Sequence, residues 1–450
     1  MGFGSIQFKS SDTFLEERFE WAKKMALSYS HHGEDKVGLW YEAALPERDS
    51  FCIRDISHQI HGATFLGLDK HSKNMLEKFI LNISDKRDYC TYWEIDKDNQ
   101  PTAVDYTNDT DFWYVLLANF ELVVACYQQY CYTGDTELIN GTAYEEFFQQ
   151  TFNEYIDRWD LDGDGILEHY QCYGRRGLAS YNEVVTSILH GGDMLAVQYA
   201  AYHAYSQILF IRGCTDQAVR YREKAETLQR YYLNNWYNPE TESFYGAKQE
   251  NGDFYPEYFE EGNFLPIYFQ IFKEDDKLEK AIATVKENPV KNVEGLTYMA
   301  QTFYQYDKIS EGWDFFNQLI DPDLHRNEYP EVSYSIIANY VSGMMGLNVT
   351  DYLKFTVRNN CLINATNELE NIPLFNGELD LSYKSEKEIE LCYNGFERPI
   401  CTVTFNGSYD YCQLNGEIKE LLQTKDRNGQ KISQMNLILD NNCAYKIQVR

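Results

Sequence analysis

About twelve amphipathic stretches dominate the first 350 residues and constrain the fold of this chain more than any other feature. In each stretch, apolar residues recur at i, i+3, i+4 and i+7, which places them along one face of a helix. Short connections join most stretches into pairs, and long connections rich in Gly, Asp, Asn and aromatic residues separate the pairs. The expected helices span 13–29, 54–67, 71–82, 110–132, 142–159, 191–212, 214–235, 262–273, 275–286, 295–306, 308–320 and 331–346.

Alternating short and long connections are typical of a ring of helical hairpins. Short turns then lie on one face, and the long loops collect on the other face and build a cleft. A helical solenoid is the alternative, but the fixed-period repeat of a solenoid is not visible. The sequence therefore predicts a mainly α fold, an (α/α)6 toroid over residues 1–350. The long loops span 30–53, 83–109, 160–190, 237–261 and 321–330.

The last hundred residues have a different pattern of apolar and polar residues. Segments such as LKFTV, ELDLSY and PICTVTFNG alternate apolar and polar residues with period two, as half-buried strands do. The hairpin dipeptide Asn-Gly recurs there, for example at 394–395, 406–407, 415–416 and 428–429. Residues 351–450 are therefore predicted to form a small β-sandwich with a packing role.

Net charge and composition limit the classes of molecule that this protein is expected to bind. The formal net charge of -30 repels phosphate backbones and anionic lipids, so nucleic acid and membranes are not expected partners. The 37 tyrosines suit a cleft that stacks on and hydrogen-bonds to a neutral carbohydrate. Residues 1–12 carry no signal-peptide pattern, and the 11 cysteines are scattered. We expect a cytoplasmic protein with reduced cysteines, and the sequence leaves its oligomeric state open.

The segment WYEAALPERDSFCIRDISHQIHGATFLGL at 40–68 carries the clearest chemistry. Arg54 and Asp55 open a helix, where a cation and a carboxylate side by side can clamp vicinal hydroxyls. This segment resembles the six-hairpin glycosidases of the glucoamylase and α-L-rhamnosidase type. The resemblance implies that Arg54 and Asp55 hold the terminal sugar, with Asp49 and His58 nearby. The Pro-x-Arg-Asp pattern ending at Asp49 is rhamnosidase-like, but Ser50 stands where those enzymes place their acid.

The same resemblance implies where a catalytic pair would lie. In glucoamylase-like enzymes the general acid lies between the fifth and sixth helices, which here points to Glu183. The general base lies just before the twelfth helix, which points to Glu331 or Glu328. Glu331 is preferred because a helix start fixes its direction. Each of these residues could also be a surface acid or a helix-terminal acid favoured by the dipole.

Further candidates lie in the long loops. WDLDGDGILEHYQ at 159–171 matches the first half of an EF-hand through Asp160, Asp162 and Asp164, but Gln171 replaces the bidentate Glu of the twelfth position. A plain Asx-rich turn is the alternative. We expect no cofactor and keep calcium as a second possibility. The residues expected to contact sugar in these loops are Trp93, Asp111, Trp113, Glu168 and Glu261, and Tyr92 and Glu94 flank Trp93.

The leading prediction is a glycosidase that cleaves a terminal glycosidic bond with inversion, using Glu183 as acid and Glu331 as base. A sugar epimerase or a polysaccharide lyase on the same fold is one alternative, and Arg175-Arg176 hints at the anion site that a lyase needs. A non-catalytic carbohydrate-binding protein is another, because Ser50 departs from the rhamnosidase pattern. The sequence lacks a P-loop, GxGxxG, HExxH or Gly-x-Ser-x-Gly motif.

Overall fold

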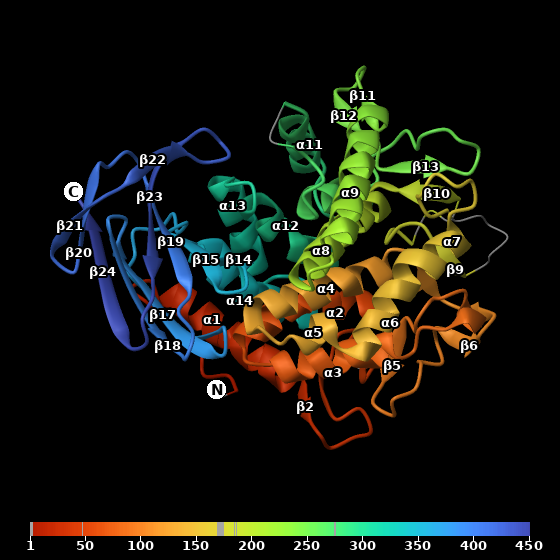
Figure 1. Cartoon of the computed structure of the whole chain (residues 1–450), viewed down its shortest axis with the longest axis horizontal. Coiled ribbons are helices and arrows are strands. Elements are labelled where there is room, and N and C mark those ends of the chain that lie inside the picture. Colours follow the sequence, from red (N-terminus) through yellow and green to blue (C-terminus); the bar gives the residue numbers. More distant parts are fainter. Residues whose placement is uncertain (1–2, 47, 169–174, 184, 186, 274–275) are drawn as a thin grey trace.

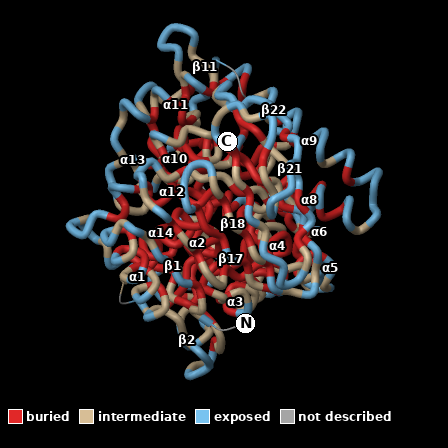
Figure 2. Tube along the Cα trace, turned by 90° about the vertical axis from the view of Figure 1, so that its left-hand side faces the viewer, coloured by how far each residue is buried: buried red, intermediate tan, exposed pale blue. Residues whose placement is uncertain are grey.

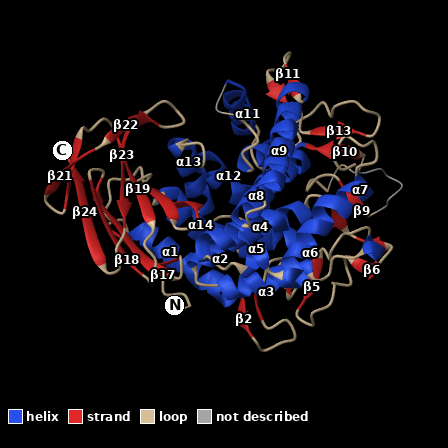
Figure 3. Cartoon of the chain, viewed as in Figure 1, coloured by secondary structure: helices blue, strands red, loops and turns tan. Residues whose placement is uncertain are grey.

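Helices and strands separate into two parts in the computed structural model, which describes residues 3–46, 48–168, 175–183, 185, 187–273 and 276–450 (Figure 1, Figure 3). The helical part precedes residue 348, and two larger sheets follow it. The described α-helices are α1 (Thr13–Ser28), α2 (Ile53–Phe65), α3 (Asp69–Ile80), α4 (Ala118–Thr133), α5 (Glu137–Asn140), α6 (Thr142–Gln150), α7 (Ile156–Trp159), α8 (Gly192–Ile211), α9 (Thr215–Asn235), α10 (Glu260–Tyr268), α11 (Asp276–Glu287), α12 (Val293–Tyr304), α13 (Ile309–Leu319) and α14 (Pro330–Ala338). Two π-helical segments, η2 (Thr151–Tyr155) and η4 (Asn339–Met344), join α6 to α7 and extend α14.

Six of the described helices contact one another in a closed cycle. Helix α2 packs on α4, α4 on α8, α8 on α10, α10 on α12, α12 on α14, and α14 returns to α2. Other helices lie outside this cycle, each against a member of it: α9 packs on α8, α13 on α12 and α1 on α14. The alternation of helices expected from the sequence is therefore present, with an inner and an outer helix in each of these pairs.

The inner helices are buried around most of their circumference. All nine residues of α14 are buried, and only two residues of α2 are not, so the trace there is buried on every side (Figure 2). A helix that is buried on all faces needs apolar or small residues on all faces, whereas a helix that is buried on one face needs only one apolar stripe. Among the described helices, none combines the length and apolar character that a membrane crossing requires.

Close packing of α2 on α14 depends on Gly62. A Cβ atom at this position would lie 2.1 Å from the carbonyl oxygen of Tyr334. We expect Gly62→Ala to lower the free energy of unfolding by about 1–3 kcal/mol, because the two helix backbones must separate. Thermal unfolding of the variant checks this. Ser57→Ala on the same helix is the control and should change the stability far less; equal stability of the Gly62 variant and wild type would contradict the close contact.

One expected helix is wrong in its first third. The stretch 110–132 is not a continuous helix, because strands β7 (Asp111–Phe112) and β8 (Tyr114–Val115) precede α4. Strand β8 pairs with β9 (Arg176–Leu178), and the Leu116 amide donates to the Leu178 carbonyl at 2.8 Å. Pairing with a distant segment therefore overrides the helical period in this stretch.

The C-terminal part contains two sheets, mainly antiparallel. Between them, Phe355 and Phe375 have ring centroids 6.1 Å apart, and Cys412 Sγ lies 3.4 Å from Met435 Sδ. The seven-stranded sheet has the order β1 (Gln7–Ser10), β16 (Asn367–Leu374), β17 (Gly377–Ser385), β18 (Glu388–Asn394), β24 (Cys443–Val449), β20 (Tyr411–Leu414) and β21 (Glu417–Glu420). The five-stranded sheet has the order β14 (Asn348–Asp351), β15 (Lys354–Arg358), β19 (Ile400–Asn406), β23 (Lys431–Ile438) and β22 (Leu422–Lys425), with β15 and β19 parallel.

The sheets are joined tightly to the helices. Strand β1 comes from the N-terminal end of the chain yet forms the edge of the seven-stranded sheet, paired with β16. Arg358 of β15 binds Asp307, which follows α12, at 3.0 Å and Asp426 at 2.9 Å. The Phe375 amide donates to the Tyr132 carbonyl at the end of α4. These contacts hold the C-terminal sheets against one end of the helical ring.

Candidate functional site

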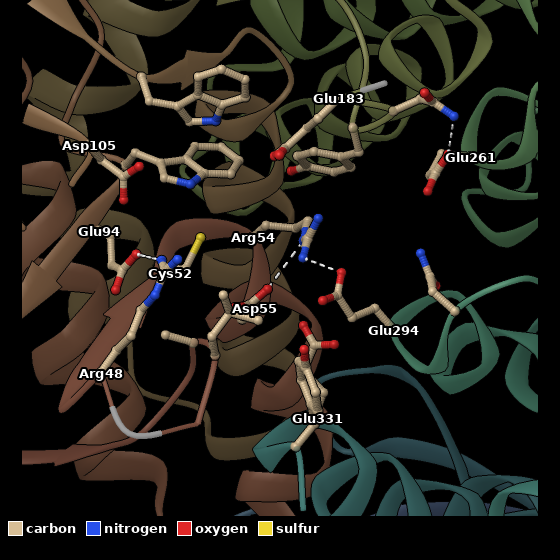
Figure 4. Close-up of a pocket in the computed structure, with 18 residues that line it drawn as sticks. Arg48, Cys52, Arg54, Asp55, Glu94, Asp105, Glu183, Glu261, Glu294 and Glu331 are labelled. Carbon is tan, nitrogen blue, oxygen red and sulfur yellow. Dashed lines mark hydrogen bonds and ion pairs between the residues drawn. The ribbon is translucent and has the colours of Figure 1, made fainter. Parts of the chain in front are cut away.

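A pocket of about 400 Å³ lies where the N-terminal ends of several inner helices meet the long loops (Figure 4). Its walls come from segments spread over almost 300 residues of sequence. The described lining residues are Ala44, Leu45, Arg48, Cys52, Arg54, Asp55, Trp93, Glu94, Asp105, Trp113, Tyr181, Asn182, Glu183, Glu261, Asn292, Glu294, Tyr329 and Glu331. Seven of these are carboxylic acids and two are arginines, so acidic groups dominate the pocket.

Most of these acids share one structural origin. Each of the six inner helices carries an acidic residue in its first turn, where backbone N–H groups and the helix dipole favour negative charge. Four helices contribute a pocket-lining acid, and the other two contribute buried acids in contact with Tyr181, which lines the pocket. The first-turn acids are Asp55 (α2), Glu121 (α4), Asp193 (α8), Glu261 (α10), Glu294 (α12) and Glu331 (α14).

Arg54 lies among these acids. Its Nε donates to Asp55 Oδ1 at 3.1 Å, and its Nη2 donates to Glu294 Oε2 at 2.9 Å. The guanidinium carbon also lies 5.6 Å from the ring centroid of Tyr181. In Figure 4, Glu183 lies on one side of Arg54 and Glu331 on the other. The guanidinium therefore sits between the two carboxyls that the sequence singles out.

Glu331 occupies the first turn of α14, directly after Pro330. The side chain is buried, and neither carboxyl oxygen has a hydrogen-bond donor among the described residues. Burial and the adjacent Asp55 carboxylate raise the pKa of Glu331 well above its usual range, against the effect of Arg54. Such a group has free lone pairs, and its pKa is shifted toward the protonated form. It is suited to proton transfer with a bound molecule.

Glu183 stands on the loop before α8, where flanking contacts fix the backbone. Asp193 accepts from the Tyr181 amide at 2.7 Å and from Ser180 Oγ at 2.9 Å. Asn182 donates to Glu261 Oε2 at 2.9 Å. The Glu183 side chain is exposed toward the open side of the pocket, yet partial loss of water raises its pKa above the ordinary value. The carboxyl is thus both accessible and biased toward its protonated form.

Asp193 and Glu121 form a buried layer behind the Glu183 loop. Tyr181 donates its hydroxyl to Glu121, and burial raises the pKa of Glu121 to about 8. Burial also raises the pKa of Asp193 to about 7. Both groups touch the loop rather than the open pocket, which makes them positioning residues for the Glu183 segment.

A second acid cluster lies around Glu94 on β5 (Glu94–Asp96). Arg48 donates to Glu94 Oε2 at 2.8 Å, and Ser50 donates to Oε1. Burial, together with the nearby Asp105, raises the pKa of Glu94 to about 7. The sequence marked Ser50 as a missing acid, and the structure brings the Glu94 carboxyl from the paired strand against that serine. The pairing of β4 (Ser50–Cys52) with β5 is the signal that could have placed Glu94 beside Ser50.

Trp93 and Trp113 supply apolar surface in the otherwise acidic pocket. Trp93 is mostly buried, with its ring centroid 6.3 Å from that of Tyr181. Trp113 follows the short strand β7 and is partly exposed. Aromatic faces beside carboxyl groups can pack against an amphipathic ring that also carries hydroxyl groups. Both residues were expected to contact sugar.

Five of the expected site residues lie outside this pocket. Asp49 pairs with Lys97 on the surface, and Asp111 is exposed with Arg175 at 3.5 Å. Glu328 is exposed and lies 3.7 Å from Arg326. Glu168 belongs to the acidic turn that contains Asp160, Asp162 and Asp164. His58 lines a different pocket.

That second pocket, of about 320 Å³, opens at the other end of the ring. Its lining includes His58, His61 and Glu121 from the inner helices and Val349 from β14. Burial lowers the pKa of His58 to about 3 and that of His61 to about 4, so both rings are neutral. Glu121 lines this pocket and binds Tyr181, which lines the first, so this hydrogen-bonded pair separates the two.

Comparison with known proteins was made by sequence and by structure. No protein-family model matches the sequence, and no curated protein matches it either. A GH78 family rhamnosidase of Bacillus sp. GL1 superposes with a TM-score of 0.65 at 10% identity, over 87% of this chain and 42% of the other. An α-L-rhamnosidase from Dictyoglumus thermophilum gives 0.65 at 12% identity, over 99% and 50%.

Both superpositions cover most of this chain, including its helical part and its C-terminal sheets. This chain has a six-hairpin glycosidase fold. A protein from the human microbiome described as a kojibiose phosphorylase shares it, with a TM-score of 0.63 at 10% identity over 97% of this chain and 63% of the other. The chain spans about half the length of the two rhamnosidases, and at these identities the likeness concerns the fold alone.

Proposed function

We propose that this chain is a glycoside hydrolase built on an (α/α)6 toroid, residues 1–350, with a C-terminal β-sandwich, residues 351–450, in a packing role. The substrate would be a neutral oligosaccharide or glycoside whose terminal bond is cleaved with inversion. One observation carries the proposal. Acids from the first turns of several inner helices converge with Trp93, Trp113 and Arg54 in one pocket, and Glu183 and Glu331 lie on either side of the guanidinium.

In the proposed mechanism, Arg54 and Asp55 hold vicinal hydroxyls of the terminal sugar while a tryptophan face covers its ring. Glu183, at the open side, donates its proton to the glycosidic oxygen as the bond to the anomeric carbon breaks. Glu331, on the buried side, accepts a proton from the water that attacks that carbon. Inversion requires the two carboxyls to stand about 6.5–9.5 Å apart so that this water fits between.

Water is favoured over phosphate as the attacking group. A phosphorylase must bind inorganic phosphate beside the sugar, and the pocket holds seven carboxylic acids against two arginines. Arg54 is already bound to Asp55 and Glu294, and Arg48 to Glu94. An anion would meet net repulsion here, whereas water and a neutral sugar would not.

The alternative enzyme classes fit the pocket less well. A polysaccharide lyase would need cations for the substrate carboxylates, but Arg176 binds Asp88 and Arg175 contacts Asp111 and the Asp105 carbonyl. An epimerase that uses histidine would need an imidazole at the sugar, and none of the described lining residues is a histidine.

The test is turnover of a panel of neutral disaccharides and aryl glycosides in phosphate-free buffer. We expect release of free sugar, with the first-formed anomer inverted when proton NMR follows the reaction. Turnover that requires phosphate and yields a sugar phosphate would overturn hydrolysis in favour of phosphorolysis. An unsaturated, ultraviolet-absorbing product would instead identify a lyase, and tight binding without turnover would identify a binding protein.

The proposed roles predict a specific pH dependence. The active form has Glu331 ionised and Glu183 protonated, so kcat should be bell-shaped in pH, with its two limbs set by the raised pKa values of these two groups. Asp55→Asn removes the neighbouring charge that raises the Glu331 pKa. The limb that follows Glu331 should move to lower pH by about one unit or more. Asp49→Asn, at the surface, should leave both limbs in place, and an unmoved limb in Asp55→Asn would contradict the coupling.

A further inference from the structure

The turn after α7 gathers four carboxylates away from the pocket. Asp160, Asp162, Asp164 and Glu168 each offer an oxygen, and these oxygens all lie within 4.8 Å of one another. Asp162 and Asp164 are exposed, and Asp160 is partly so. The ion pairs of the described residues include no Lys or Arg within 4 Å of the three aspartates, so only amides of the turn donate to these carboxylates there.

Glu168 distinguishes this turn from an ordinary acidic surface loop. Its side chain is 1% exposed. The Oε2 atom accepts from the Leu161 amide at 2.5 Å, but Oε1 has no hydrogen-bond partner. The ring of His190 approaches Oε1 only to 3.6 Å, beyond hydrogen-bond distance. A buried carboxylate oxygen without a partner is costly, and the carboxyl group to which it belongs also lies beside three more carboxylates. A bound cation would remove both penalties.

We propose that this turn is a calcium-binding site in which Asp160, Asp162, Asp164 and Glu168 are the side-chain ligands. They occupy positions 1, 3, 5 and 9 of an EF-hand-like loop, and Ile166, at position 7, supplies a backbone carbonyl. Gln171, at position 12, lies outside the described residues. The buried Glu168 supplies the negative charge that the twelfth position of a complete EF-hand would bring.

The spacing of the oxygens favours calcium over magnesium. Calcium binds oxygen at about 2.3–2.6 Å, so two ligands on opposite sides of the ion are at most about 4.6–5.2 Å apart. Magnesium, at about 2.0–2.1 Å, would allow only about 4.0–4.2 Å. The 4.8 Å spread fits the calcium range, and it would have to contract to hold magnesium.

The turn is already held in a binding shape. Asp160 Oδ1 accepts from the amides of Gly163 and Asp164, and its Oδ2 accepts from the Gly165 amide. Gly163 and Gly165 have φ values of 82° and 88°, which side-chain-bearing residues rarely adopt. Binding therefore costs little reorganisation of the backbone.

An ion here would join three parts of the helical ring. Glu168 donates its amide to the Trp159 carbonyl at the end of α7, and Gln198 of α8 donates to the Gly165 carbonyl at 2.6 Å. His190, beside Glu168, lies on β10 (Ile188–Gly191), which leads into α8. The site would thus fasten α7, β10 and α8 at the base of the segment that carries Glu183.

The experiment is calorimetric titration of the full chain, freed of metal with a chelator, with calcium chloride and separately with magnesium chloride. We expect one calcium per chain, binding below roughly 1 mM, and much weaker magnesium binding. Calcium at 100 times its Kd should shift the folding equilibrium about 100-fold, seen as a rise in Tm. These readouts do not depend on any enzymatic activity.

Calcium binding by substituted proteins tests which side chains form the site. Glu168→Gln should weaken calcium binding by more than about 10-fold, since even outer-shell substitutions cost about 10–100-fold. Asp162→Asn, at an exposed position that tolerates change, should weaken calcium binding to a similar extent. This variant tests the site even if the buried Glu168→Gln variant fails to fold. Glu154→Gln, an exposed acid on the preceding helical segment, is the matched control and should bind as wild type does. Wild type without calcium binding, or Asp162→Asn with unchanged affinity, would overturn the proposal.

Discussion

Glu331→Gln is expected to lower kcat by about 10²–10⁴-fold on every substrate that the protein turns over, the contribution typical of a general base. The amide has nearly the shape of the carboxyl but cannot take a proton from water. Because the loss concerns the attacking water, it should be equally large for poor and for good leaving groups. Initial rates measure the two losses, on a disaccharide for the poor leaving group and on a dinitrophenyl glycoside of the same sugar for the good one.

Glu328→Gln is the matched control for that variant, three residues away in the same segment. Its carboxyl is exposed, paired with Arg326 and outside the pocket. We expect its kcat to stay within about two-fold of wild type, as is usual for surface substitutions far from chemistry. If Glu328→Gln lost activity and Glu331→Gln kept it, the base would lie on the loop and not on the helix.

Glu183→Gln is the second large effect, and its signature is different. A general acid matters most when the leaving oxygen is strongly basic, so turnover of a disaccharide should fall by about 10²–10⁴-fold. A dinitrophenyl glycoside leaves without protonation, and its turnover should fall far less. The ratio of the two losses separates an acid from a base, which a single rate cannot do.

Glu257→Gln, an exposed acid on the loop before α10, serves as the control for Glu183→Gln and should change neither rate. Equal losses on both substrates in Glu183→Gln would contradict the acid role. In that case Glu94, whose pKa of about 7 and position in the pocket suit an acid, becomes the group to replace next.

The periodicity of apolar residues predicted most of the helices because inner and outer helices bury whole faces. Residues 110–117 were mistaken for helix, since the pairing of β8 with β9 depends on a segment sixty residues away that no local period reveals. The resemblance to six-hairpin glycosidases singled out Glu183, Glu331, Arg54 and Asp55, and these four residues line one pocket. Glu294 was missed, although Asn292 as helix cap and an acid in the first turn marked the position.

The structure separates Glu328 from Glu331, the two base candidates of which the sequence preferred Glu331. Both are acids near the expected twelfth helix, but Pro330 starts α14 and turns Glu331 inward, whereas Glu328 stays with Arg326 at the surface. Likewise, Ser50 looked like the loss of an acid. Only the strand pairing brings the Glu94 carboxyl to that serine, because the two residues are 44 positions apart in sequence.

The edge strand β1 ties the two ends of the chain together, and this has a consequence for how the protein forms. Ser10 Oγ binds Asn367, 357 positions later, and α1 and α2 both pack on α14. During synthesis the first helices must therefore wait, with apolar surface uncovered, until α14 and β16 have left the ribosome. Such high contact order slows folding and exposes the nascent chain to aggregation, so its production should depend strongly on chaperones.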